Sequence, residues 1–153
     1  IDKDIKSIAE TYFLKAPIKG RFIGVDARIF INQSTEHYDL IFSDSYNSTN
    51  IPSFLLSKEY FEQLKQHLTL NGYIVFNMLI NPFYQDRYSR KIDNTLNAVF
   101  SHCLKHPMGY SVLTNVIYVC QKMPENSETG IYTDEQNTAS IDKFMVNDTA
   151  KVM

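Results

Sequence analysis

Apolar segments alternate with amphipathic segments along this chain. Four apolar segments are typical of strands: "RFIGVDA", which ends at Asp26, and then "YDLIFSD", "YIVFNML" and "YSVLTNVIYVCQK". Apolar residues at helical spacing predict helices over Lys3–Phe13, after Ser57, and over Asp86–His102. The alternation of strands and helices predicts an α/β fold whose sheet is mainly parallel.

Polar and turn-forming residues mark where these elements begin and end. Asp2 is a good N-cap for the first helix, Ser57 caps the second, and Asn71–Gly72 is predicted to end that second helix. A short helix over Ala27–Gln33 follows the first strand. The last apolar segment is expected to be a bent strand or a hairpin, with its turn at Thr114–Asn115.

Two apolar patterns indicate which surfaces are buried. Leu40–Phe42 is continuously apolar, as expected for a strand that is covered on both faces of a parallel sheet. The first helix carries an apolar stripe made of Ile5, Ile8, Ala9 and Tyr12. The stripes of the later helices predict the core residues Tyr60, Phe61, Leu64, Leu68, Ile92, Leu96, Val99 and Phe100.

Length and charge narrow the class of protein. The 153 residues, 44% of them apolar, suffice for one domain with a packed core. The net charge of -2 gives no support for nucleic acid or an anionic membrane as partner, and the longest apolar run is too short to span a bilayer. Residues 124–153 carry a net charge of -4, so we predict a domain over residues 1–123 and a mobile acidic tail.

The cysteines and histidines give little sign of a metal site. Cys103 and Cys120 lack CxxC spacing, which argues against a disulfide scaffold and a zinc site and fits a reducing cytosol. His102 and His106 are four residues apart at a predicted helix end, a spacing that can bind metal, but two ligands do not make a site. We therefore predict no metal and a cytoplasmic location.

Two acids follow the ends of predicted strands. Asp26 and Asp44 would both lie at the carboxyl rim of a parallel sheet, which is where ligands bind in open α/β sheets. A carboxylate at such a rim prefers a ligand that donates hydrogen bonds, such as a purine amino group, ribose hydroxyls or an amine. The alternative is that each acid caps the helix or turn that follows it, and two acids on one rim favour the ligand site.

Several segments, in order and with consistent spacing, resemble the spermidine synthase family, the polyamine aminopropyltransferases. They are "IDKDIKSIAETYF", "VDARIFI", "YDLIFSDSYNSTNIPSFLLSKEYFEQLKQHLTLNGYIVFN" and "NVIYVCQK", and the likeness covers residues 1 to about 122. The resemblance implies the Rossmann-like fold of class I S-adenosylmethionine-dependent methyltransferases. It also implies a transferase of polyamine biosynthesis that moves an aminopropyl or related alkyl group from a sulfonium nucleotide to an amine such as putrescine.

The same resemblance assigns roles to particular residues. Asp26 and the backbone of Ala27 would hold the adenine end of decarboxylated S-adenosylmethionine, or of S-adenosylmethionine, while Asp44 would lie beside the reacting carbon and the amine. The cofactor-binding residues that we expect are Asp2, Asp26, Ala27, Asp44 and Ser45. The catalytic residues that we expect are Asp44, Tyr46 and Asn47.

The sequence departs from the family pattern at two places. Where the family loop carries its second acid, the base, this chain has Asn47, and an amide cannot accept a proton at neutral pH. Asp44 would then act as the base, Tyr46 would help, or aminopropyl transfer would be lost. The family's first strand, glycine-rich loop and ribose-binding acid would precede Asp2, and since the chain starts "IDKDIKSIAE" we expect it to lack them.

These departures leave several functions open. A sheet without its first strand would have unpaired central strand edges, so we predict dimerisation, strand exchange or poor solubility. The first hypothesis is a spermidine synthase-like transferase. One variant of it is a methyltransferase-like enzyme, because Asn47 replaces the expected base. The second hypothesis is a non-catalytic remnant that only binds or assembles.

Overall fold

The computed structural model describes residues 4–45 and 51–123 of the chain. The chain divides into two compact units, Ile1–Ser34 and Thr35–Met153. Three of the expected site residues lie outside the described residues, namely Asp2, Tyr46 and Asn47. The predicted tail over residues 124–153 also lies outside them.

The first unit contains helical segments that carry few buried side chains. Helix α1 (Ile5–Ile8) continues into a π-helical segment, η1 (Ala9–Leu14), which ends at Lys15 in the left-handed conformation. The predicted first helix is therefore present, but Asp4 rather than Asp2 occupies its N-cap position. Its apolar stripe was expected to be covered, yet in the structure Tyr12 is 68% exposed and Ile5 is 48% exposed.

The strand predicted over "RFIGVDA" is absent from the structure. Residues 21–26 form no strand, and Phe22, Ile23 and Val25 are exposed. A strand requires a neighbour that takes up its backbone hydrogen bonds, and no described strand pairs with this segment. The helix predicted after it is confirmed as α2 (Ala27–Gln33).

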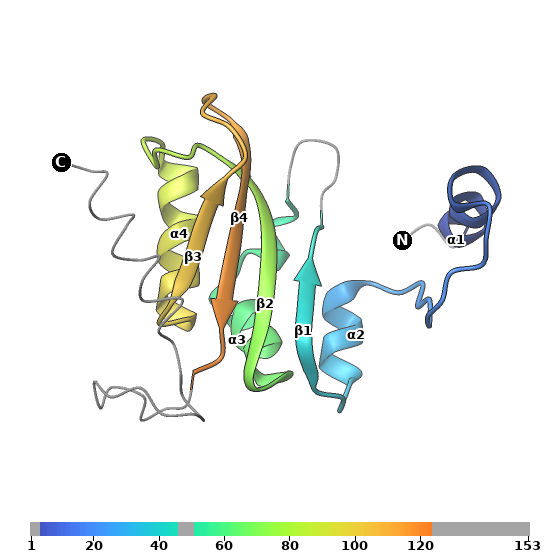
Figure 1. Cartoon of the computed structure of the whole chain (residues 1–153). Coiled ribbons are helices and arrows are strands. Elements are labelled where there is room, and N and C mark those ends of the chain that lie inside the picture. The colour runs from blue at the N-terminus through green and yellow to red at the C-terminus, as the bar shows by residue number, and fades with distance from the viewer. Residues whose placement is uncertain (1–3, 46–50, 124–153) are drawn as a thin grey trace. The chain divides into compact units, whose positions relative to one another are not determined.

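The second unit contains a four-stranded sheet in the order β1-β2-β4-β3 (Figure 1). Its strands are β1 (Tyr38–Ser43), β2 (Leu68–Ile80), β3 (Cys103–Pro107) and β4 (Thr114–Gln121). Only the β1–β2 pairing is parallel, whereas β2–β4 and β3–β4 are antiparallel. The α/β class is confirmed, and a mainly parallel sheet is wrong for the described strands, because the last two strands form a hairpin.

That hairpin differs from the predicted one. Residues 108–113 make its turn, and Thr114 and Asn115 already belong to β4. Strand β3 occupies residues that were assigned to a helix end. Helix α4 ends at Val99, and Phe100 has an extended backbone. The helix therefore stops before His102, where it was predicted to end.

Two helices cover one face of the sheet (Figure 1). A short 3-10 turn, η2 (Ser53–Leu55), leads into α3 (Lys58–Gln66), and α4 is Arg87–Val99. Ser57 caps α3 by accepting a hydrogen bond from the Tyr60 backbone N–H. The rings of Phe61, Phe76 and Phe100 contact edge to face between α3, β2 and the end of α4. The predicted core is confirmed: Tyr60, Phe61, Leu64, Leu68, Ile92, Leu96, Val99 and Phe100 are all buried.

The opposite face of the sheet is partly open. Leu40 and Phe42 are 60% and 63% exposed, so β1 is not covered on both faces as its apolar run predicted. Leu40 pairs with Tyr73 of β2, whose side chain is also exposed. Since successive side chains of a strand alternate in direction, these residues share the face that the helices leave uncovered.

The Asn71–Gly72 turn lies inside β2 rather than at the end of α3. Tyr38 pairs with Leu68 but Leu40 pairs with Tyr73, so β2 bulges between these positions, and Asn71 there has a φ of 64°. A Cβ on Gly72 would lie 2.9 Å from the Thr69 carbonyl oxygen and 3.1 Å from that of Tyr38. Glycine is therefore required where the two backbones approach.

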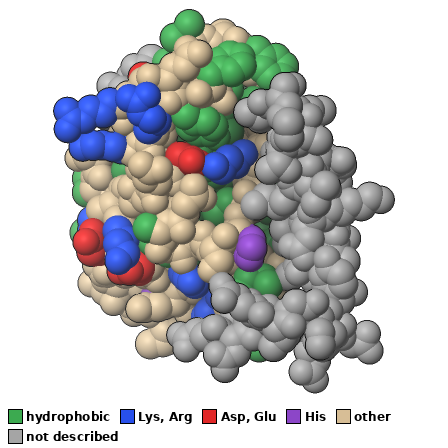
Figure 2. Space-filling model, turned by 90° about the vertical axis from the view of Figure 1, so that its left-hand side faces the viewer, with side chains coloured by type: hydrophobic (Ala, Val, Ile, Leu, Met, Phe, Trp, Pro, Cys, Tyr) green, Lys and Arg blue, Asp and Glu red, His purple; other side chains and the backbone are tan. Residues whose placement is uncertain are grey.

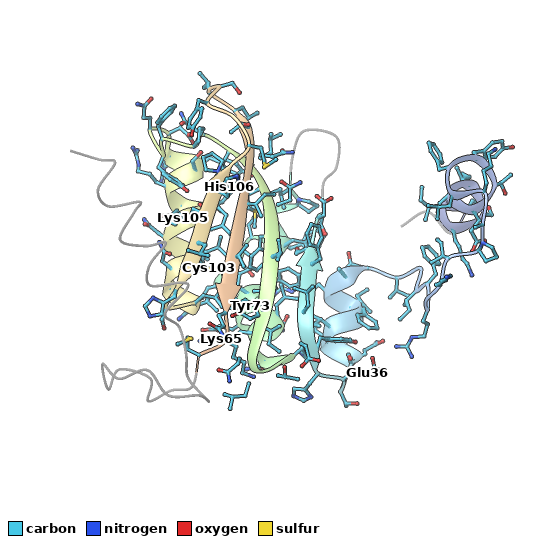
Figure 3. The ribbon with its side chains drawn as sticks, viewed as in Figure 1. Glu36, Lys65, Tyr73, Cys103, Lys105 and His106 are labelled. Carbon is cyan, nitrogen blue, oxygen red and sulfur yellow. A yellow bond between two sulfur atoms is a disulfide. The ribbon has the colours of Figure 1, made fainter. Side chains whose placement is uncertain are left out.

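A polar cluster joins α4 to the hairpin. Tyr118 Oη lies 3.0 Å from Asp93 Oδ1 and 3.0 Å from Tyr84 Oη, and Lys105 Nζ lies 2.6 Å from Asp93 Oδ1. Burial, followed by the Tyr84 hydrogen bond, raises the pKa of Tyr118 well above its ordinary range. Figure 3 labels Lys105 on β3, and Figure 2, seen from the side of α4 and β3, shows acidic and basic side chains next to one another.

The two cysteines form a disulfide, contrary to the sequence prediction. Cys103 and Cys120 face each other across the β3–β4 ladder, and both are buried. CxxC spacing does not reveal such a pair, because its partners come together only when the hairpin forms. The two cysteines therefore give no support for a reducing compartment.

Removing this disulfide should destabilise the protein. The bond closes a loop with a sequence separation of 17, for which the loss of unfolded-state entropy corresponds to about 3 kcal/mol. We expect the free energy of unfolding of the wild type, measured with urea, to fall by about this amount after reduction of the disulfide. The doubly substituted Cys103→Ala, Cys120→Ala protein, our control, should not respond to the reductant. An unchanged wild-type midpoint after complete reduction would contradict this expectation.

The start of α4 contains an acid whose ionisation is coupled to folding. Asp86 Oδ1 accepts the Ser89 backbone N–H at 2.8 Å, and its Oδ2 accepts the Ser89 hydroxyl at 2.6 Å. Ser89 Oγ in turn accepts the Asn81 backbone N–H. These bonds, led by that of the Ser89 hydroxyl, lower the pKa of Asp86 below its ordinary value of 3.8.

Part of the loss of folding stability at low pH should therefore come from protonation of Asp86. Because the pKa of Asp86 is lower in the folded state, its contribution is fully present above pH 3.8 and is lost as the pH falls through the folded pKa. Asp86→Asn can still cap the helix but cannot titrate. We expect the urea midpoints of the two proteins to converge as the pH is lowered from about 5 to about 2. Curves that remain parallel over this range would show that Asp86 is not coupled to folding.

Candidate functional site

The carboxyl end of β1 brings a carboxylate and an amide together. Asp44 and Ser45 directly follow β1, and Ser43 pairs in parallel register with Phe76 of β2. Asp44 is therefore level with Asn77, whose Nδ2 donates a hydrogen bond to Asp44 Oδ1 at 3.1 Å. Asp44 remains exposed, so its carboxylate is accessible to a ligand.

Asn77 is a site residue that the sequence reasoning missed. It lies in the middle of the strand "YIVFNML", and its Oδ1 is buried without a hydrogen-bond partner among the described residues. A polar residue inside an otherwise apolar strand is the signal that could have identified it. The parallel register with β1 is what places it beside Asp44.

Asp26 acts as the N-cap of α2. Its Oδ1 accepts the backbone N–H groups of Arg28 at 2.9 Å and Ile29 at 3.2 Å. Ala27 is the first residue of that helix. The alternative that Asp26 caps the following helix is thus confirmed. Because Asp26 and Asp44 belong to different units, their position on a common rim stays a prediction.

An apolar loop lies at the same end of the sheet as Asp44. Thr114, which follows this loop, pairs with Ile80 at the carboxyl end of β2. Phe83 and Tyr110 contact each other with ring centroids 6.2 Å apart. The exposed apolar side chains of the two loops at this end are Phe83, Met108, Tyr110, Val112 and Leu113.

The histidines do not stand at a helix end as predicted. His106 belongs to β3, and Figure 3 labels it there, while His102 precedes that strand. Within residues 4–45 and 51–123, no group of three His, Cys, Asp or Glu side chains could hold a metal ion. In the same part of the chain, every helix is too short or too polar to cross a membrane.

Together these contacts define what the rim can do chemically. Asp44 can accept a hydrogen bond or a proton from a ligand, and Asn77 already binds one of its carboxylate oxygens. Asn77 Oδ1 is buried and has no hydrogen-bond partner among the described residues, so the exposed Asp44 carboxylate is the accessible acceptor of this pair. The site is therefore suited to a ligand that donates an N–H or O–H group.

Comparison with known sequences gives one matching family and two curated relatives. The family model of the spermine/spermidine synthase domain matches residues 19–130. A probable polyamine aminopropyl transferase of Bifidobacterium longum is 29% identical over 102 residues, which are 67% of this chain and 23% of that protein. A polyamine aminopropyltransferase of Vibrio vulnificus is 26% identical over 121 residues, 76% of this chain and 40% of that protein. The chain thus spans less than half the length of both relatives.

Solved structures with the same fold include two kinds of protein. A probable spermidine synthase from Corynebacterium glutamicum has a TM-score of 0.63 and 17% identity, covering 92% of this chain and 50% of that one. A spermidine synthase in complex with the transition-state analogue AdoDATO has a TM-score of 0.63 and 16% identity, with coverages of 99% and 60%. Human methyltransferase-like protein 13 in complex with SAH has a TM-score of 0.68 and 18% identity, with coverages of 100% and 70%. At these identities the likeness establishes the fold, which is the methyltransferase-like α/β fold that was predicted.

Proposed function

Since this chain belongs to the spermine/spermidine synthase family, we propose that its protein transfers an aminopropyl or related alkyl group from a sulfonium nucleotide to an amine. The observation that carries this proposal is the carboxylate of Asp44, which is exposed at the carboxyl end of β1 and held by Asn77 inside the matched region. Because the chain spans 23% and 40% of the curated relatives, the proposal concerns the protein to which the sequence belongs.

The reaction requires a nucleophile, an electrophile and a base. The amine nitrogen attacks the methylene carbon next to the sulfonium, the carbon–sulfur bond breaks, and its electron pair stays on the sulfur of the leaving methylthioadenosine. The amine must lose a proton to become a nucleophile and another after attack, so a carboxylate within hydrogen-bond reach is needed. We assign this role to Asp44, with Ser45 beside it.

The donor that we propose is decarboxylated S-adenosylmethionine or S-adenosylmethionine, and the acceptor is an amine such as putrescine. Two neighbours in fold are complexes with AdoDATO and with SAH, which supports a ligand of this type. The N-cap residue Asp26 and the backbone of Ala27, the first residue of α2, would hold the adenine end. Asp26 uses Oδ1 to cap α2, so any ligand contact of that oxygen would share it with two backbone N–H groups.

The proposal also covers the oligomeric state and the cellular location of the protein. We propose a homo-oligomer, which the exposed apolar side chains of the edge strand β1 support. We also propose a cytoplasmic location, which rests on the family match alone because the Cys103–Cys120 disulfide is no evidence for a reducing compartment.

Nucleotide binding should depend on the carboxylate of Asp26. Asp26→Ser keeps a side chain that caps helices but removes the charge, so we expect the fold to persist while binding of methylthioadenosine weakens by about tenfold or more. Isothermal calorimetry measures this affinity. The control is Asp39→Asn, which changes an acid whose partner is the Thr69 hydroxyl at the other end of β1, and it should bind like the wild type. No heat from the wild type at millimolar nucleotide would overturn the proposed donor.

Asn47 should limit transfer, because an amide cannot accept the amine proton. Asn47→Asp restores a carboxylate where the family has its base, and we expect it to raise the rate of transfer to putrescine by about 10²- to 10⁴-fold. The rate is measured from the methylthioadenosine formed with decarboxylated S-adenosylmethionine as donor. A wild type that already turns over at the rate of the variant would show that Asp44 suffices as base. Nucleotide binding without transfer in either protein would favour a non-catalytic remnant, and methyl transfer would favour the methyltransferase alternative.

A further inference from the structure

A chain of polar side chains links the loop after β2 to the interior of the fold. Tyr118, on β4, is fully buried, and its Oη lies 3.0 Å from Asp93 Oδ1 and 3.0 Å from Tyr84 Oη. Asp93 belongs to α4, and its Oδ1 lies 2.6 Å from Nζ of Lys105, on β3. The Tyr118 hydroxyl therefore lies where a loop, a helix and two strands meet.

The directions of these hydrogen bonds follow from the chemistry of the groups. Tyr118 has one hydroxyl hydrogen and a carboxylate can only accept, so Tyr118 donates to Asp93 and its oxygen accepts the hydroxyl hydrogen of Tyr84. Lys105 Nζ donates to the same carboxylate and lies 5.2 Å from the centre of the Tyr84 ring. Burial, followed by the Tyr84 hydrogen bond, raises the pKa of Tyr118, so its hydroxyl keeps the proton that it donates.

Tyr84 has a backbone conformation that needs such support. Its φ is 53°, in the left-handed region, which residues other than glycine adopt at a cost in conformational energy. The Tyr84 N–H donates to the Asn81 carbonyl at 3.0 Å, and the Phe83 N–H donates to Asn81 Oδ1 at 2.8 Å. The anchored hydroxyl of Tyr84 therefore helps to hold a strained turn, in the loop over residues 81–86, in one conformation.

This loop borders the candidate site. Phe76 of β2 pairs with Ser43 at the end of β1, and β2 continues for four residues beyond Phe76, to Ile80, before the loop begins. The loop therefore starts about 13 Å beyond the level at which β1 ends, on the side where ligands bind in open α/β sheets. A ligand that extends from Asp44 in the same direction approaches the loop, so the position of the loop affects how the reactants are oriented.

We propose that Tyr118 is a positioning residue for group transfer, because its hydroxyl holds Tyr84 and, through it, the 81–86 loop at the rim that carries Asp44. Tyr118 touches no reactant in this scheme and acts on their orientation alone. The inference rests on the proposed function. It gives a role to a buried hydroxyl outside the candidate site, and it predicts that removing this one oxygen slows transfer while the nucleotide still binds.

Hydrogen exchange tests whether Tyr118 holds the loop. Tyr118→Phe keeps the buried ring and removes the hydroxyl, so we expect the amides of Phe83 and Tyr84 to exchange about tenfold faster. Tyr84→Phe removes the other end of the same bond, so it should also speed exchange, and the double variant should exchange no faster than Tyr118→Phe. Tyr88→Phe makes the same chemical change at an exposed tyrosine of α4 and should exchange like the wild type.

Kinetics test whether the loop positions the reactants. Transfer to putrescine is measured in the Asn47→Asp background, where a carboxylate stands at the position of the family's base. There we expect Tyr118→Phe to lower kcat by about tenfold, because small displacements of the reactants weaken catalysis strongly. The affinity for methylthioadenosine should stay unchanged, and Tyr88→Phe should leave both quantities at their values in Asn47→Asp alone. Thermal melting identifies the variants that are folded at the assay temperature.

The outcomes separate the positioning role from a structural one. Faster exchange and a lower kcat with an unchanged nucleotide affinity support the assignment. Unchanged exchange in a folded Tyr118→Phe overturns it, and so does faster exchange with an unchanged kcat. Should Tyr118→Phe not fold, the same measurements on Tyr84→Phe, whose side chain is partly exposed, decide in its place. If no transfer is detected in Asn47→Asp, the proposed function fails and the positioning role falls with it, even where exchange shows that Tyr118 holds the loop.

Discussion

The parallel pairing of β1 with β2 is the constraint on which the candidate site depends. Parallel strands require a crossover, and α3 supplies it while burying its apolar stripe against the sheet. The register then sets Asp44 level with Asn77, although 33 residues separate them in the sequence. Neither side chain forms a site without the other: Asp44 would be an ordinary surface acid, and Asn77 a costly polar group in an apolar strand.

Local patterns predicted the elements whose formation depends on nearby residues. The caps at Ser57 and Asp26, the stripe through Phe61 and Leu64, and the apolar segment of β1 all follow from periodicity and capping chemistry within a few residues. The errors lie where distant residues decide. "RFIGVDA" has the composition of a strand, but none of the strands in the described part of the chain pairs with it. Cys103 meets Cys120 only through the hairpin.

The sequence predicted one of the two residues that the structure brings together at the candidate site, Asp44, and missed the other, Asn77. The position of Asp44 follows from an acid that ends an apolar strand, and the family resemblance added its chemical context. Asn77 was missed because its meaning depends on register, which the order of residues does not reveal. Asp26 and Asp44 belong to different units, so their position on a common rim stays a prediction.

The bulge in β2 decides which changes in chain length the site tolerates. Between the Leu68 and Tyr73 pairings the strand carries extra residues that match nothing in β1, so a family member could lose or gain residues there without altering the register beyond Gly72. From Tyr73 to Phe76 each residue of β2 pairs with one residue of β1, so a change of length there would shift the register. A single inserted residue there would turn the amide towards the aromatic core around Phe76 and present a hydrophobic side chain to Asp44. We therefore expect a change of length to be better tolerated in the bulge before Gly72 than between Tyr73 and Asn77.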